Sequence, residues 1–299
     1  MTNIYWAVYK NLEAEIVKLT YAIHVDDNQL EVYSSLISDL ILRASAEIES
    51  ISKELYKANG GTKTQKIKYD SDALDHLNGL WKIDKKVVLI SSINCYQTSK
   101  ILIPFAKNET STFHGGMTYS WNNSYQNLKH DRANSLRFGS IKYLFDIMAA
   151  LFILNIYYKS ERYPLKRDAQ ATSFPIGLGS ELFSIKLHAW SSYDGKNNYL
   201  RRDEFDECLY FTGYTKDSLE EIEKAHEEMV KHQEELFSKH PKFINYQKNN
   251  NIQDYKGNNL MFDVLGRDDY MSLMGIASPK MLEVYKTTEF EGLINKDDA

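Results

Sequence analysis

The stretch that decides the fold runs from Trp121 to Tyr158 and reads WNNSYQNLKHDRANSLRFGSIKYLFDIMAALFILNIYY. Its second half is almost uninterruptedly apolar, which predicts a helix buried in a hydrophobic core. The best apolar run, Ile147 to Tyr158, is shorter than the roughly 20 residues that cross a membrane. We therefore expect a core helix and no membrane partner.

The first half of this stretch carries a dense polar cluster. Asn127, Lys129, His130, Asp131 and Arg132 lie within six positions. An imidazole titrates near neutral pH and can move a proton, and cations beside it can stabilise charge on a phosphate. The alternative is structural: Asn127 and His130 would cap backbone groups, and the basic residues would be solvated.

Two local geometries fit this cluster. If residues 123–141 formed one helix, Asn127, His130, Asn134 and Arg137 would share a face. If residues 131–134 formed a loop, with Asn134 or Ser135 capping the apolar helix, His130 would lie at the junction. Both geometries place His130 at the mouth of a helical bundle.

Composition indicates a folded globular protein in a reducing compartment. The chain has 299 residues, 43% of them hydrophobic, and a formal net charge of -5. Cys95 and Cys208 are too far apart in sequence to match a metal-binding motif. We therefore expect no metal and no cofactor. The first residues lack the pattern of a secretory signal, so a cytoplasmic location is expected.

Charge is distributed unevenly along the chain. Residues 129–167 contain eight basic and three acidic side chains, whereas residues 203–235 contain twelve carboxylates and three lysines. The basic region could face phosphates, and the acidic region would repel them.

Further helices and strands follow from periodicity. Apolar residues at three- and four-residue steps predict a long helix over 29–57, capped by one of residues 26–28, and a shorter helix over 5–24. The apolar segment 87–105 fits one helix or two short strands, and we favour the helix. Alternation predicts strands at 182–187 and 208–213.

The pattern changes near residue 165, which predicts two domains. Residues 1–165 would form a helical bundle. Residues 166–299 would form a smaller α+β extension with an acidic helix from about 217 to 239 and a tail that is mostly loop, with one helix near 280–286.

Two segments resemble the HEPN superfamily of compact α-helical domains. They are LILRASAEIESISKELY within the early helix and NLKHDR running into FDIMAALFILNIYY. Many members are metal-independent ribonucleases of toxin, antiviral-defence and RNA-processing systems. The family motif is Arg, four to six residues, then His; His130 matches its histidine, and no Arg precedes it at that distance.

The resemblance implies a site and an assembly. His130 would move the proton, with Lys129 or Arg132 as the electrostatic partner and Asn127 orienting the phosphate or the imidazole. Glu47, on the early helix, would hold the tautomer of His130, or it forms an ordinary surface ion pair four residues from an arginine. Sites of this family form where two protomers meet, which implies a homodimer.

Two functions of different classes follow. The first is an RNA-directed effector of stress or phage defence that acts as an endoribonuclease. Its partners would be RNA and an antitoxin or another defence-system protein. The second is a non-catalytic helical module that binds a nucleotide or a partner protein.

Overall fold

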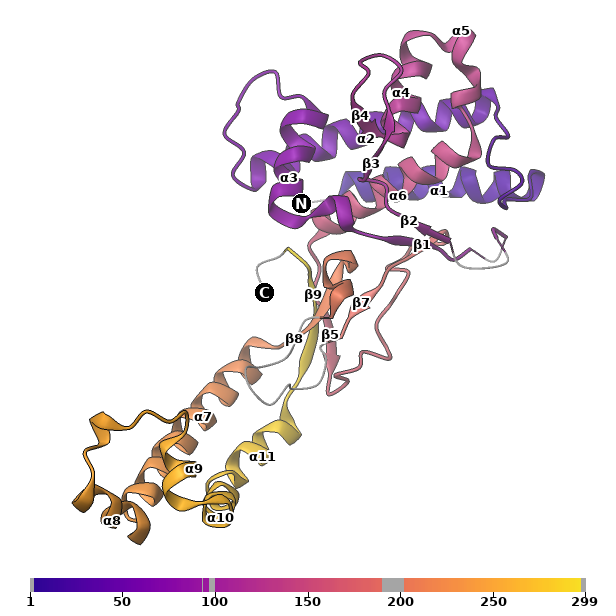
Figure 1. Ribbon diagram of the computed structural model, residues 1–299. Coiled ribbons are helices and arrows are strands. Elements are labelled where there is room, and N and C mark those ends of the chain that lie inside the picture. The colour runs from indigo at the N-terminus through magenta and orange to yellow at the C-terminus, as the bar shows by residue number, and fades with distance from the viewer. Residues whose placement is uncertain (1–2, 93, 97–99, 190–201, 297–299) are drawn as a thin grey trace. The chain divides into compact units, whose positions relative to one another are not determined.

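The computed structural model describes residues 3–92, 94–96, 100–189 and 202–296. The protein is mainly α-helical with a smaller β part (Figure 1). Its chain forms two compact units. The first comprises residues 1–163, 170–212 and 292–299, and the second comprises residues 164–169 and 213–291.

Three long helices form the core of the first unit. Helices α1 (Ile4–Ala22), α2 (Ser35–Ala58) and α6 (Ile141–Lys159) pack against one another in pairs (Figure 1). Helix α6 is apolar on all sides and is long and apolar enough to cross a membrane, but 78% of that apolar window is buried inside the protein. The prediction of a buried core helix is confirmed.

Helix α2 confirms the predicted long helix but begins later. Its N-cap is Ser34, whose hydroxyl accepts a hydrogen bond from the Ile37 amide, and not one of residues 26–28. Backbone bonds from the start of α6 hold the preceding segment: the Lys142 and Ile141 amides donate to the carbonyls of Leu30 and Val32. A segment held in this way cannot extend the helix.

The decisive stretch is divided into several elements. Helix α4 (Ser120–His130) ends at Asp131, where φ is -146° and ψ is 52°, and a single turn, α5 (Arg132–Ser135), and a 3-10 turn at Leu136–Phe138 follow. The continuous helix over 123–141 is therefore wrong. The helix does break after His130, but residues 132–135 form a helical turn instead of the loop expected over 131–134. The N-cap of α6 is Ser140, instead of Asn134 or Ser135.

Short elements complete the first unit. They are α3 (Asp75–Trp81), preceded by a π-helical turn (Tyr69–Leu74), the three-stranded sheet β2-β1-β6 and the hairpin β3-β4. The bounds of the strands are β1 (Val88–Ile90), β2 (Lys100–Leu102), β3 (Lys107–Thr110), β4 (Met117–Tyr119) and β6 (Phe183–Ser184).

The helix favoured for residues 87–105 is wrong, because this segment forms β1 and β2. The two strands pair antiparallel, with Val88 opposite Leu102 and Ile90 opposite Lys100. Strand β1 also pairs with β6, which lies far along the chain. The β-branched side chains of β1 are therefore in a sheet, where such residues are favoured.

The boundary predicted at residue 165 differs from the observed division, because later segments pack into the first unit. The hydroxyl of Tyr157 donates to the carbonyl of Asn295, and residues 180–182 bind the buried carboxylate of Glu13 on α1. The chain passes between the units within strands of a sheet ordered β5-β9-β8-β7. Their bounds are β5 (Tyr163–Lys166), β7 (Leu187–His188), β8 (Tyr210–Tyr214) and β9 (Phe290–Ile294).

The second unit is largely helical. The predicted acidic helix is α7 (Lys216–Ser238), capped by Thr215, and α10 (Arg267–Ala277) and α11 (Pro279–Thr287) pack on it. Helices α8 (Pro241–Asn249) and α9 (Leu260–Leu265) pack against each other. The tail expected to be mostly loop is therefore mostly helix, and the single helix predicted near 280–286 is α11.

Candidate functional site

His130 is the last residue of α4 and is exposed to solvent. The Asp131 amide donates to the Asn127 carbonyl at 2.9 Å, which closes the helix directly after the imidazole. The ring of His130 lies against Phe113, with 5.7 Å between ring centroids and an angle of 60° between planes. The imidazole is therefore accessible to a large substrate and has an aromatic neighbour.

Phe113 belongs to a loop that joins β3 to β4 beside α4 (Figure 1). Ser111 organises this loop: its hydroxyl accepts from the amides of Phe113 and His114, both at 3.2 Å, and its backbone pairs with Gly115 and Gly116. Gly115 has a φ of +69°, a conformation that favours glycine. The loop leaves the Phe113 side chain 42% exposed.

The same loop supplies a second imidazole. The ring of His114 lies 6.4 Å from that of Phe113 and is exposed. His114 is not among the site residues predicted from the sequence. The β3-β4 hairpin places its loop at the end of α4, and the sequence alone gives no sign of this.

Cations flank His130 in sequence, and each has a neighbour. The ammonium of Lys129 lies 5.1 Å from the centroid of the Tyr125 ring, and its pKa is raised chiefly by a hydrogen bond with Tyr125. Arg132 is exposed, and its guanidinium donates at 3.4 Å to the carbonyl of Ser35. Both charges lie near the end of α4, where they can attract a polyanion.

Asn127 lies beneath this surface. Its side chain is 6% exposed, and its amide donates to the hydroxyl of Thr112 at 2.7 Å and to the carbonyl of Asn123 at 2.8 Å. These bonds join α4 to the β3-β4 loop. Asn127 therefore positions the loop instead of facing solvent.

Glu47 lies apart from His130. It is half-buried on α2, which raises its pKa, and Arg43 opposes that shift. In the described part of the chain, no hydrogen bond or ion pair joins Glu47 to His130. Arg43, four residues earlier on α2, acts on Glu47 through its charge, but no ion pair joins the two side chains in the described part of the chain.

These positions define what we call the His130 rim: Phe113, His114, Lys129, His130 and Arg132. It combines two exposed imidazoles, one exposed aromatic ring and two cations. Residues 3–92, 94–96, 100–189 and 202–296 contain no group of three His, Cys, Asp or Glu side chains placed to hold a metal ion. The imidazoles and cations of the rim can supply proton transfer and charge stabilisation.

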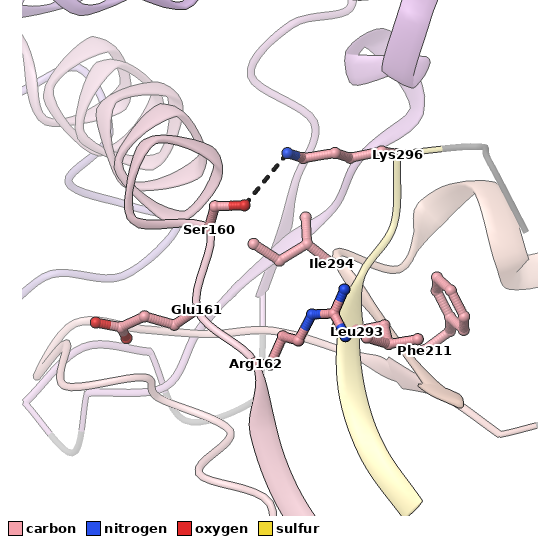
Figure 2. A pocket seen from close by; sticks show the side chains of 7 residues that line it. All are labelled: Ser160, Glu161, Arg162, Phe211, Leu293, Ile294 and Lys296. Atoms are coloured by element: carbon pink, nitrogen blue, oxygen red, sulfur yellow. Dashed lines mark hydrogen bonds between the residues drawn. The ribbon is translucent and has the colours of Figure 1, made fainter. Parts of the chain in front are cut away.

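A second basic location lies at the end of α6. There Ser160, Arg162, Phe211 and Lys296 line a pocket of about 310 Å³ (Figure 2). The Lys296 ammonium donates to the Ser160 hydroxyl at 3.2 Å and lies 5.5 Å from the centroid of the Trp81 ring. Because this cation is engaged internally and the pocket lacks an imidazole, the His130 rim is the stronger candidate.

Comparison of the chain with protein-family models, with curated proteins and with solved structures gives no match.

Proposed function

We propose that the protein is an RNA-directed effector that cleaves RNA without a metal ion at the His130 rim. One observation carries this proposal: His130 is exposed at the end of α4, between two cations in sequence, and the ring of Phe113 lies 5.7 Å from it and 6.4 Å from a second exposed imidazole, His114. Two imidazoles can supply both the base and the acid that transesterification of RNA requires.

The chemistry follows from the groups present. One imidazole, unprotonated, removes the proton of a ribose 2′-hydroxyl, and that oxygen attacks the adjacent phosphorus. The bond to the 5′-oxygen breaks, and the other imidazole, protonated, gives its proton to this leaving oxygen. Lys129 and Arg132 stabilise the negative charge that develops on the phosphoryl oxygens. The products are a 2′,3′-cyclic phosphate and a 5′-hydroxyl.

Phe113 suits a single-stranded substrate. An exposed aromatic ring beside cations can stack on an unpaired base while the cations hold the backbone. Its edge-to-face contact with His130 would place a stacked nucleotide next to the imidazole.

The biological setting of the proposal rests on the HEPN resemblance. It comprises action in the cytoplasm as a homodimer within a stress or phage-defence system, and control by an antitoxin or another partner protein. Growth arrest on expression in bacteria, relieved by His130→Ala, is the expected phenotype.

The direct test is cleavage of end-labelled single-stranded RNA in the presence of EDTA. His130→Ala should lower the rate by about 10²-fold or more, the usual contribution of a general acid or base, and His114→Ala should do the same. His24→Ala is the matched control, because His24 is an exposed histidine that pairs with Asp26. Cleavage by His130→Ala at the wild-type rate would overturn the proposal, and RNA binding without cleavage by the wild type would favour the non-catalytic module.

A further inference from the structure

A separate pocket of about 500 Å³ lies beside α6 in the first unit. Its size is within the range of sites that hold small molecules. Much of the lining is apolar, and this part includes Leu30, Ile90, Ile101, Leu102, Ile103, Ala106 and Phe145. A ligand with an apolar body would therefore bury apolar surface in this pocket, which favours binding.

Two carboxylates face this apolar lining, and one of them has a cation. Glu109 of β3 accepts a hydrogen bond from the Lys142 ammonium at 2.6 Å and from the Asn123 amide at 3.2 Å. The hydroxyl of Tyr143 donates to it at 3.4 Å. The charges of Glu109 and Lys142 thus compensate each other.

The other carboxylate, Asp146, forms no ion pair among the described residues, although the charge of Lys142 opposes the rise of its pKa. It lies one turn after Lys142 on α6, and the hydroxyl of Ser120 and the backbone amide of Trp121 donate to it. Neither donor is charged, and within the described ranges no ion pair includes Asp146. Burial raises its pKa to about 6, and at neutral pH an ionised carboxylate remains at the wall of the pocket.

The remaining charge in the lining is also paired. Lys100 of β2 forms an ion pair with Asp27, and its ammonium lies 4.9 Å from the centroid of the Tyr96 ring. The lining thus holds two lysines and two carboxylates. Lys142 pairs with Glu109 and Lys100 pairs with Asp27, which lies outside the lining, so among the described residues Asp146 is the lining charge without an ion-pair partner. An anionic ligand would be repelled.

We propose that this pocket binds a small organic cation, a protonated amine or an amidinium or guanidinium group on an apolar body, whose N–H groups donate to the carboxylate of Asp146. The apolar body would contact Phe145 and the aliphatic residues of the lining. A charged hydrogen bond to a carboxylate that lacks a cation is among the stronger contacts that such a pocket can make. This site is independent of the proposed RNA cleavage, because it uses no residue of the His130 rim.

The test is calorimetric titration of the whole protein, without RNA, with benzylamine and benzamidine as probes and benzyl alcohol as their uncharged counterpart. Both cations should bind at pH 8, and benzyl alcohol should bind at least tenfold more weakly. Between pH 8 and pH 5 the affinity for the cations should fall about tenfold, because most Asp146 carboxylates become protonated below a pKa of about 6. Glu109 and Lys142 face the same carboxylate and remain paired with each other.

Two variants test the contribution of the carboxylate and that of the cavity separately. Asp146→Asn should weaken cation binding at least tenfold and abolish its dependence on pH, and Ala106→Phe should block binding by filling the pocket while leaving Asp146 in place. Asp39→Asn, a change at an exposed position of α2, should bind like the wild type. Absence of binding by the wild type, equal binding of benzyl alcohol, or unchanged binding by Asp146→Asn would each overturn the proposal.

Discussion

The side-chain amide of Asn127 donates a hydrogen bond of 2.7 Å to the hydroxyl of Thr112, the residue before Phe113. Through this bond the last turns of α4, which carry His130, hold the loop that carries Phe113 and His114. Asn123 of α4 adds a second attachment, because its side-chain oxygen accepts from the Thr112 amide at 3.1 Å. Asn127 supports the rim from below.

Asn127→Ala should lower the free energy of unfolding by about 1–3 kcal/mol, because it leaves buried partners without a hydrogen bond. It should also slow RNA cleavage, because the loop loses one of its attachments to α4 and keeps only those to Asn123. Urea denaturation and the RNA cleavage assay measure the two effects. Asn134→Ala is the control, since Asn134 is exposed and bonds with the side chain of Asp131. Equal stability of the two variants would contradict the positioning role.

Asp146 should make stability depend on pH. Its folded-state pKa of about 6 lies above the usual value near 4, so the folded protein binds this proton more tightly than the unfolded chain does. The contribution of Asp146 is most favourable below pH 4 and is lost as the pH rises through 6. Asp146→Asn should therefore be more stable than the wild type by on the order of 2–3 kcal/mol at pH 8, with the difference vanishing near pH 4. Denaturation curves at the two pH values measure this, and a constant difference would contradict it.

Glu13 holds the segment 180–182 against α1. Its side chain is buried and accepts from the hydroxyls of Tyr9 at 2.9 Å and Ser180 at 2.5 Å, and it pairs with Lys10 at 2.5 Å. Glu13→Ala should cost about 1–3 kcal/mol, since it leaves buried donors without an acceptor. The Lys10 side chain is 33% exposed and also pairs with Glu181, so loss of the ion pair adds little.

The matched control for Glu13 is Glu15→Ala on the same helix. Glu15 pairs with Lys18, and both side chains are largely exposed, so its loss should have a much smaller effect on stability. Chemical denaturation of the two variants makes the comparison. Similar losses for both would show that the segment 180–182 does not depend on Glu13.

The helices α7 to α11 should be removable as one piece. The Thr215 amide donates to the Glu289 carbonyl at 3.1 Å, so the two ends of this helical segment lie side by side. Replacing residues 216–287 by a short Gly-Ser linker should leave the first unit folded, with unchanged near-ultraviolet circular dichroism. A cut after residue 166, by contrast, should unfold it, because residues 180–182 and 295 pack into its core.

The same excision tests the role of the acidic helix. Helix α7 carries many carboxylates, and its removal should raise RNA affinity at low salt if these charges compete with RNA for the basic region. Salt-titrated binding of a labelled RNA provides the measurement. Unchanged affinity would show that α7 does not oppose RNA binding.

The arrangement of apolar residues predicted the long helices correctly, because α2, α6 and α7 each carry a helical pattern within their own residues. Their beginnings depend on distant contacts: Ser34 caps α2 because the start of α6 holds the segment before it. The segment of β1 and β2 was wrongly predicted to be a helix. An apolar, β-branched run fits either structure, and the strand that pairs with it cannot be identified from the run itself. That strand, β6, lies far along the chain.

The candidate site divides in the same way. His130 and its neighbouring cations could be identified because they are adjacent in sequence. His114 could not, since only the β3-β4 hairpin brings its loop to the end of α4. Asp146 was hidden within an apolar helix, where one carboxylate in the sequence gives no sign of a pocket.

The most direct test of RNA cleavage at the His130 rim uses two matched oligonucleotides in the presence of EDTA. One is all RNA, and the other carries 2′-deoxyribose at the mapped cleavage position. The account predicts that the wild type cleaves the first to a 2′,3′-cyclic phosphate and a 5′-hydroxyl, does not cleave the second, and loses activity in His130→Ala. Cleavage of the deoxy-substituted strand, or a 5′-phosphate product, would contradict it.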